Sequence, residues 1–208
     1  MSLLAYFNCS DPHVGRVDKS VLSQQVLMEM VISEIKNCER ICGSREEPND
    51  VIEWAGVTVD METQLITEIH LICMQLQGAI DAQWIPASVV KINAINNSLD
   101  DTLDFASFPP TIMELWMNFN RFSGSLELQK LPESLCRLAA RLNSFAGSVC
   151  FTELPAGLAY IDLSETQLSA NPTKGHLSVV GWTSTPVLGE AKNLFKPLVV
   201  FLSWRRPY

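Results

Sequence analysis

Apolar residues and prolines return along the chain at a fixed interval of 23 residues. The prolines stand at Pro86, Pro109, Pro132 and Pro155. An apolar residue occupies the third, sixth and eighth position after each proline, and the sixth position of the last three repeats holds Leu115, Leu138 and Ile161. The eleventh position holds Asn97, Asn120 and Asn143, and then Thr166. A period of this length predicts a solenoid, in which each repeat forms one coil and stacks on the next.

Within each repeat, the pattern predicts two extended segments joined by turns. The apolar residues at the sixth and eighth positions flank one outward position, which is the alternation of a short strand. Successive copies of this strand are expected to form a parallel sheet. The asparagine can satisfy backbone groups where the chain turns out of the strand, and Gly124 and Gly147 supply the next bend. A second extended segment is expected on the far side, from the alternation of Leu126, Leu128, Val149 and Phe151.

These columns spell the pattern LxxLxLxxNxL, of which Leu135 to Phe145 is one copy, and an earlier, weaker copy from Ile66 has Met74 in place of the asparagine. The pattern resembles the leucine-rich-repeat family. The stretch Phe122-Ser123-Gly124-Ser125-Leu126 is similar to the LSGxL signature of plant-type repeats, and the Leu-Pro-x-Ser-Leu opening to repeats of kinetoplastid protists. The resemblance implies an α/β leucine-rich-repeat solenoid, a right-handed horseshoe whose parallel β-sheet lines the concave face.

The flanks of the array lack the period and are expected to form caps. We assign residues 63–170 to about five repeats, residues 1–62 to an N-terminal cap and residues 171–208 to an irregular C-terminal cap or tail. Apolar residues at positions 28, 31, 35, 38 and 42 have helical spacing, which predicts a helix over about 21–42 that ends at Gly43. Glu53 to Val59 resembles the W-x-G-V-x-C strand that precedes plant-type repeats, but Val59 replaces the cysteine, which removes the disulfide of extracellular relatives.

The charge and the cysteine content limit which classes of partner and which cellular location can be expected. A net charge of −8 opposes binding to nucleic acid or to an anionic membrane surface, so neither partner is expected. No CxxC pair occurs among the six cysteines, so we expect no metal and no cofactor. The first residues lack the basic and apolar regions of a signal peptide, and the apolar run at 198–202 is too short to cross a bilayer and predicts a strand. An intracellular, cytoplasmic location is therefore expected.

If the strands follow LxxLxL, the residues that flank the inward leucines face outward on the concave sheet. Trp116, Arg137 and Arg141 are expected at the centre of a binding surface, because tryptophan and arginine dominate binding hot spots. The same columns add Glu114, Asn118, Asn93, His70, Tyr160 and Asp162. The alternative is a solvated sheet on which Glu114 pairs with Arg137 and Trp116 lies flat across its neighbours.

Binding through this surface is the expected function, because the sequence contains no recognisable catalytic motif. Nucleotide-binding glycine motifs and the Gly-x-Ser-x-Gly pattern are absent, so the protein is not expected to be an enzyme. The first hypothesis is a protein-protein interaction module that binds a protein or peptide on the concave face. The second is a structural subunit of a larger assembly, held through its caps and convex face. A third, weaker one is a thiol protein that uses His70 and Cys73, and RNA binding through Arg137, Arg141 and the basic C-terminal end is a fourth.

Overall fold

The computed structural model describes residues 18–151, 153–170 and 199–201. Its N-terminal part contains the 3-10 helix η2 (Lys19–Val21), the α-helices α1 (Gln24–Val31) and α2 (Glu39–Cys42), and the 3-10 helix η3 (Val51–Glu53). The strands are β1 (Val57–Val59), β2 (Ile66–His70), β3 (Gln77–Gly78), β4 (Lys91–Asn93), β5 (Ser98–Leu99), β6 (Glu114–Trp116), β7 (Ser123–Gly124), β8 (Arg137–Ala139), β9 (Ser144–Val149), β10 (Tyr160–Asp162), β11 (Gln167–Ala170) and β12 (Val199–Phe201). Three more 3-10 helices are η4 (Ala82–Trp84), η5 (Phe105–Ser107) and η6 (Leu128–Lys130).

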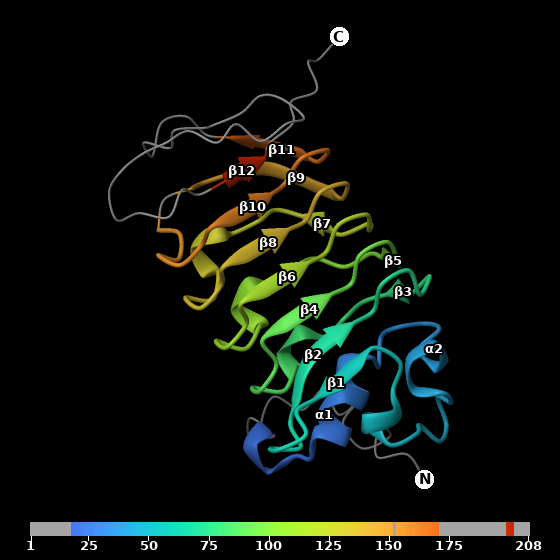
Figure 1. Cartoon of the computed structure of the whole chain (residues 1–208). Helices are drawn as coiled ribbons and strands as arrows, with labels where there is room; N and C mark the ends of the chain where they lie inside the picture. The colour runs from blue at the N-terminus through green and yellow to red at the C-terminus, as the bar shows by residue number, and fades with distance from the viewer. Residues whose placement is uncertain (1–17, 152, 171–198, 202–208) are drawn as a thin grey trace, which may run out of the picture.

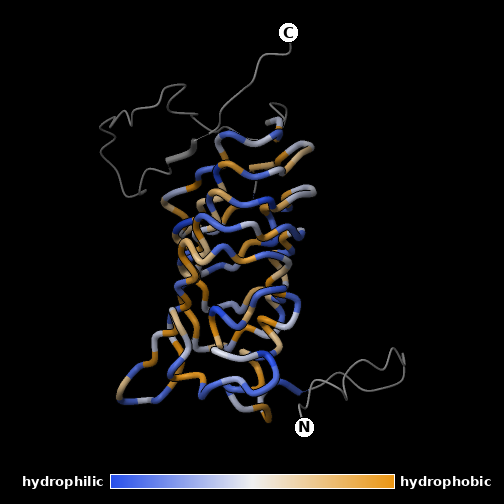
Figure 2. The backbone as a smooth tube through the Cα atoms, turned by 90° about the vertical axis from the view of Figure 1, so that its right-hand side faces the viewer, coloured by the Kyte–Doolittle hydropathy of each residue, from blue (hydrophilic) through white to orange (hydrophobic). Residues whose placement is uncertain are grey.

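The described chain is a stack of coils with one long sheet along its side (Figure 1). The seven-stranded sheet has the order β1-β2-β4-β6-β8-β10-β12, and all its pairs are parallel except β1 with β2. The remaining strands form a second column, in the order β11-β9-β7 and as the pair β3-β5. Figure 2 shows the coils in profile, with hydrophobic and hydrophilic segments alternating along each turn. The predicted repeat solenoid with a parallel sheet is confirmed.

The interior is built from the repeating apolar columns. Ile69, Ile92, Leu115, Leu138 and Ile161 lie in register on successive strands, and each is at most 2% exposed. Farther along the coil, the rings of Phe122 and Phe145 stack with centroids 6.4 Å apart. Because every coil adds the same side chains to one continuous interior, the core grows by stacking and not by closing a separate domain.

The four prolines form the same tight turn in every coil. All four are buried. Each proline carbonyl accepts the N–H of the residue three positions later, at 2.9–3.2 Å, and the donors are Val89, Ile112, Leu135 and Leu158. The proline fixes φ and has no N–H to satisfy, so it suits the start of a buried turn.

The asparagines at the eleventh position form a chain of hydrogen bonds between coils, which we call the asparagine ladder (Asn97, Asn120 and Asn143). Asn120 and Asn143 are buried, and Asn97 is half-buried. The side-chain oxygen of Asn120 accepts the backbone N–H of Leu99 in the preceding coil at 3.1 Å. Its amide group donates to the carbonyls of Ala94 and Met117, at 2.8 and 3.2 Å. Asn143 donates to the same Met117 carbonyl at 2.9 Å. Each ladder residue therefore joins its own coil to the one before it.

A smaller column of hydroxyl groups repeats two residues after the prolines. The hydroxyl of Thr111 donates to the carbonyls of Ala87 and Val89, at 2.8 and 3.0 Å. Ser134 makes the equivalent contacts one coil later, with the carbonyls of Pro110 and Ile112. The next position in the column is Gly157, which has no side chain to continue it.

The expected helix over about 21–42 is wrong as a single element. α1 ends at Val31 and α2 begins at Glu39, and between them Ile35 forms an antiparallel bridge with Gly78. Lys36 N–H donates to the Gln77 carbonyl at 2.8 Å, so this stretch pairs with β3, whose other edge is taken by β5. The helix is interrupted because an open edge of the first coil takes backbone partners from it.

The apolar spacing in the same segment nonetheless identified the buried residues. Met28, Val31, Ile35, Cys38 and Cys42 are all buried. Gly43 is the C-cap of α2, with φ at +84°. The helical period therefore located the packed face, although not the break in the backbone.

The far side of the coils also differs from expectation. Leu128 begins the 3-10 helix η6, and β7 ends before the predicted alternation, whereas β9 extends to Val149, which is one of the predicted positions. The equivalent helices η4 and η5 are capped by Asp81 and Asp104, whose carboxylates accept N–H groups two residues on. Within the described residues, α-helix occurs only in the N-terminal part.

A further regularity has no counterpart in the expected pattern. The residue just before each eleventh position has a left-handed backbone, with φ between 53° and 59°, at Cys73, Asn96, Phe119, Leu142 and Glu165. This conformation costs little for asparagine and more for other side chains. The chain therefore turns out of every strand in the same way whatever the residue there.

The C-terminal region is described only at β12. This strand pairs in parallel with β10, which agrees with the strand predicted over 198–202. The rest of the expected C-terminal cap, residues 171–198 and 202–208, lies outside the described residues.

Candidate functional site

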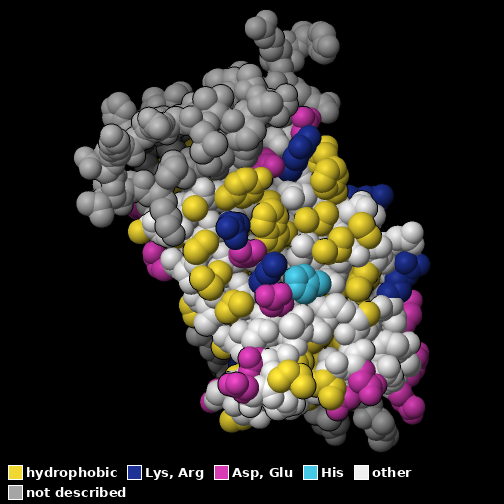
Figure 3. Space-filling view, viewed as in Figure 1, with side chains coloured by type: hydrophobic (Ala, Val, Ile, Leu, Met, Phe, Trp, Pro, Cys, Tyr) yellow, Lys and Arg dark blue, Asp and Glu magenta, His cyan; other side chains and the backbone are white. Residues whose placement is uncertain are grey.

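The candidate site is the outward surface of the seven-stranded sheet, which we call the sheet face. It is formed by Glu68, His70, Lys91, Asn93, Glu114, Trp116, Arg137, Ala139, Tyr160 and Asp162, with Asn118 and Arg141 just beyond the strands. Basic and acidic side chains alternate along the middle of this face, with hydrophobic side chains on both sides (Figure 3). The alternation arises because residues one repeat apart stand side by side on neighbouring strands, as Lys91 does with Glu114 and Glu114 with Arg137.

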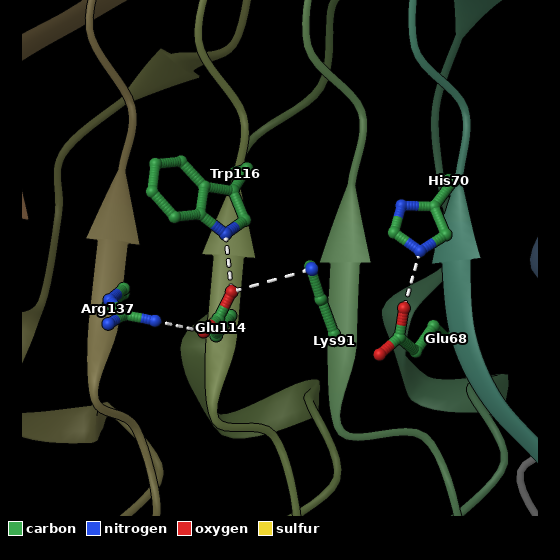
Figure 4. A network of polar contacts seen from close by, with 6 residues as sticks. All are labelled: Glu68, His70, Lys91, Glu114, Trp116 and Arg137. Atoms are coloured by element: carbon green, nitrogen blue, oxygen red, sulfur yellow. Dashed lines mark hydrogen bonds and ion pairs between the residues drawn. The ribbon is translucent and has the colours of Figure 1, made fainter.

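Glu114 is the hub of a polar network on β6 (Figure 4). Its carboxylate accepts the indole N–H of Trp116 at 3.0 Å and a hydrogen bond from Arg137. Lys91 Nζ lies 3.8 Å from the same carboxylate. The predicted pairing of Glu114 with Arg137 is therefore present, and the network fixes the orientation of Trp116.

The electrostatics of Glu114 follow from these contacts. Partial burial disfavours its charged form, but the hydrogen bonds from Trp116 and Arg137 and the charges of Arg137 and Lys91 outweigh that effect, so the pKa of Glu114 lies below its ordinary value. The carboxylate thus stays ionised at neutral pH and lies between two cations, so the three side chains together keep one net positive charge. Its side chain is 21% exposed and that of Arg137 is 52% exposed, so Arg137 remains open to a partner.

Trp116 and Tyr160 form an aromatic pair across the sheet. Their ring centroids are 6.0 Å apart although β8 lies between their strands. The rings meet diagonally across β8, where Trp116 pairs with Ala139 and Tyr160 with Arg137. Ala139 is fully buried, and its small side chain leaves room beside Trp116 for this approach. Such a pair presents a preordered flat apolar surface. Trp116 is half-buried, which differs from the exposed tryptophan expected from sequence.

Three of the predicted binding residues hold the turns at the end of the sheet. Asn93 accepts the N–H of Ile95 at 3.2 Å, and Asn118 accepts that of Arg141 at 2.8 Å. Asp162 accepts the N–H and the hydroxyl of Ser164, at 3.0 and 2.6 Å. These side chains serve the fold first.

The expected exposure of Asp162 is wrong, because it is only 8% exposed. Its strand, β10, is not an edge strand, since β12 pairs alongside it. The hydroxyl of Tyr160 lies 3.4 Å from the carboxylate of Asp162, and burial together with that negative charge raises the pKa of Tyr160 to about 12. Tyr160 therefore remains neutral over the physiological range.

The proposed pairing of His70 with a thiol does not match the contacts of either group. His70 Nε2 lies 2.6 Å from a carboxylate oxygen of Glu68 on the same strand (Figure 4). The exposed Cys73 Sγ instead accepts a contact from the Asn96 amide at 3.2 Å. Of the other cysteines, Cys38 and Cys42 are buried, and burial beside Cys38 raises the pKa of Cys42 to about 11, which keeps its thiol protonated and unreactive.

Two further properties limit the chemistry of the described residues. Among residues 18–151, 153–170 and 199–201, no three histidine, cysteine or acidic side chains converge as metal ligands would. None of the helices in this part of the chain has the length and hydropathy that a membrane crossing needs.

The sequence reasoning missed two features of the face. Lys91 and Glu68 were placed in an outward column but were not singled out, although they bind Glu114 and His70. The space that Ala139 leaves for the two rings was also overlooked. The two rings belong to different outward columns, since Trp116 pairs with Ala139 whereas Tyr160 pairs with Arg137. Their diagonal contact therefore had no direct signal in the columns, which give only residues side by side on neighbouring strands.

Comparison with known proteins gives matches among solved structures only. No protein-family model matches the chain, and no curated protein matches its sequence. The Arabidopsis receptor kinase HAESA, in complex with the peptide hormone IDA and the co-receptor SERK1, is 22% identical with a TM-score of 0.61, over 71% of this chain and 26% of its own. The BIR2 ectodomain from Arabidopsis thaliana is 18% identical with a TM-score of 0.59, over 69% of this chain and 80% of its own.

A structure of the BIR3–SERK2 complex from Arabidopsis thaliana also matches, at 17% identity and a TM-score of 0.52, over 70% of this chain and 92% of the matched one. The chain spans only about a quarter of the HAESA chain that it matches. Two of these structures are described as ectodomains or parts of receptor kinases, so they lend no support to the expected cytoplasmic location. Identities this low carry the fold alone. By its 23-residue repeats and by its match to these structures, the chain has the fold of a leucine-rich-repeat solenoid.

Proposed function

We propose that this chain is a non-catalytic interaction module that binds a protein or peptide on the sheet face. The observation that carries the proposal is the Trp116–Tyr160 pair beside two exposed arginines, Arg137 and Arg141. Aromatic rings and arginines supply most of the energy of protein interfaces, because they offer large contact area and several donors at a small entropic cost.

The order within the site supports binding over a purely solvated surface. Trp116 is held by Glu114 on one side and by the ring of Tyr160 on the other, so little conformational freedom is lost when a partner docks. Similar solenoids bind such ligands: HAESA is described in complex with a peptide hormone and a co-receptor. By analogy with that complex, a polypeptide is the partner class that we propose here.

The test is a double variant, Trp116→Ala with Arg137→Ala, immobilised beside the wild-type chain in native extract. We expect the proteins retained by the wild type to fall at least tenfold on the variant, as measured by quantitative mass spectrometry. Arg121→Gln is the matched control, because Arg121 is exposed and lies outside the sheet face. Circular dichroism should give the double variant a folded spectrum, since the interior Leu115 and Leu138 are unchanged.

Equal retention by the double variant and the wild type would contradict the proposal. That result would favour the alternative of a structural subunit, held through its caps and convex side with the sheet face idle. The His70 and Cys73 thiol hypothesis has its own check, the rate of alkylation of Cys73 at neutral pH. A rate no faster than that of free cysteine rules it out.

A further inference from the structure

A strip of apolar side chains borders the sheet face where the strands end, and we call it the rim (Ile72, Ile95, Phe119 and Leu142). Ile72 is 44% exposed and Phe119 is 45% exposed. Ile95 and Leu142 are half-buried and lie outside the core cluster.

Backbone hydrogen bonds place these residues on adjoining coils. Cys73 N–H donates to the Ile95 carbonyl at 3.0 Å, and Asn96 N–H to the Asn118 carbonyl at 3.0 Å. Asn120 N–H donates to the Leu142 carbonyl at 3.2 Å. The four rim residues therefore stand on four successive coils at the same end of the strands, and large exposed apolar residues that gather in this way mark interaction surfaces.

The choice of residues on the rim is not explained by folding. Phe119 and Leu142 stand at the left-handed turn position, with φ at 58° and 53°, where the preceding coil has Asn96 at 59°. Asparagine adopts this conformation with less strain than a large apolar residue. The chain thus places two apolar side chains where they strain the backbone and stay outside the core, which favours a role in contact with a partner.

An exposed cation, Arg141, stands next to this apolar strip. Arg141 is exposed, and within the described residues it makes none of the four ion pairs, whereas Arg137 is bound to Glu114. Its backbone N–H donates to the side-chain oxygen of Asn118 at 2.8 Å, which anchors its backbone to the neighbouring coil. An exposed cation next to apolar side chains is complementary to a carboxylate that has an apolar residue beside it.

We propose that the rim binds an extended segment of a partner protein in which a large apolar side chain neighbours an aspartate or glutamate. The carboxylate pairs with Arg141, and the apolar side chain packs between Phe119 and Ile95. This inference rests on the proposed function, since it specifies what the partner presents next to the sheet face. The chain as a whole carries a net charge of −8, so nonspecific attraction favours basic peptides, and selection of acidic ones is diagnostic.

The experiment is selection of a random twelve-residue peptide library on the full-length chain. The peptides are fused at their C-termini, so only side-chain carboxylates are offered. We expect recovered peptides to share an acidic residue next to Leu, Ile, Phe or Met. The same selection on Arg141→Glu is expected to recover Lys or Arg at that place, while Arg121→Gln selects as the wild type does.

Phe119→Asn separates binding from folding. Because asparagine suits the left-handed turn, we expect the melting temperature of this variant to rise, while the affinity for the recovered peptides falls at least tenfold. A structural role for Phe119 would instead lower the melting temperature. The inference is overturned if no peptide is enriched on the wild type, or if the acidic preference survives Arg141→Glu. A different result is that the recovered peptides bind Arg141→Glu and Phe119→Asn as tightly as wild type but lose affinity for the double variant Trp116→Ala with Arg137→Ala. That result would refute the rim inference and still support binding on the sheet face.

Discussion

Two sets of polar side chains repeat every 23 residues, one inside the coils and one on their surface, and they differ in how strictly they repeat. The asparagine ladder keeps the same residue at Asn97, Asn120 and Asn143, and each donates to the carbonyl three residues before it. The outward column on the sheet changes from Glu68 to Lys91, Glu114, Arg137 and Tyr160.

The two sets differ in regularity because one faces the interior and the other faces water. A buried backbone group without a partner costs free energy, so each internal turn needs the same side chain. An outward position has water as an alternative partner, which leaves its residue free to vary. Regular repetition therefore marks what the fold requires, and variation marks where a partner can be specified.

The largest expected effect is from Asn120→Ala. This change leaves the buried N–H of Leu99 without an acceptor and removes the donor to the Ala94 and Met117 carbonyls. We expect the free energy of unfolding to fall by about 3 kcal/mol. Urea denaturation followed by circular dichroism measures it, with Asn97→Ala as a milder comparison because Asn97 is only half-buried. A loss under about 1 kcal/mol would remove the distinction between the buried and outward sets.

The second effect concerns the two ends of the ladder. Met74→Asn restores the repeat pattern, yet we expect it to lower stability by about 1–2 kcal/mol, because Met74 packs against the core and has no preceding coil to bond. Thr166→Asn is expected to raise stability by about 1 kcal/mol, since an amide there can reach the Ala140 carbonyl as Asn143 does. Thermal melts of both variants show whether each change raises or lowers stability. Changes in the same direction would show that the repeat pattern alone, and not the neighbouring coil, determines the effect of the asparagine.

The third effect is a gain. Gly157→Ser continues the hydroxyl column of Thr111 and Ser134, and an added Cβ meets nothing closer than Cys136 Sγ at 3.9 Å. We expect stability to rise by about 1 kcal/mol, from the new hydrogen bonds and from a less flexible unfolded chain. Gly157→Ala is the control and separates the two contributions. If serine gives no more than alanine, the hydroxyl column adds nothing to stability.

The smallest effect lies on the surface. The pKa of Glu114 is lowered in the folded state, so its charge stabilises the fold above the pKa of the unfolded chain, and this contribution is lost as the pH falls through the folded value. The stability of Glu114→Gln should therefore fall less steeply than that of the wild type as the pH drops below about 4.5. At neutral pH its free energy of unfolding should differ from wild type by under about 1 kcal/mol. Melting temperatures from pH 3 to pH 7 measure it, and a slope identical to wild type would contradict the pKa direction.

Most of the fold was readable because the repeat fixes both burial and register. The inward positions of Leu115, Leu138 and Ile161, the four prolines and the ladder asparagines follow from a single period. The break between α1 and α2 was not readable, because it depends on the edge of β3, a partner distant in sequence.

The candidate site was readable only as a set of outward positions. The contact of Glu114 with Arg137 follows from the register, but the approach of Trp116 to Tyr160 depends on the space above Ala139. The burial of Asp162 depends on β12, which the repeat pattern does not include. Sequence columns thus give neighbours on adjacent strands, while contacts that skip a strand or involve a cap need coordinates.

The asparagine bonds also give the stack a direction. Asn120 satisfies the N–H of Leu99, and Asn143 that of Phe122, so each of these coils is completed by the one that follows it in the chain. A nascent chain that stops after Leu99 has an open turn that only later residues can close. Assembly from the N-terminal end, as during synthesis, would then hold one incomplete coil at a time, and a truncation would harm the coil just before the cut more than any other.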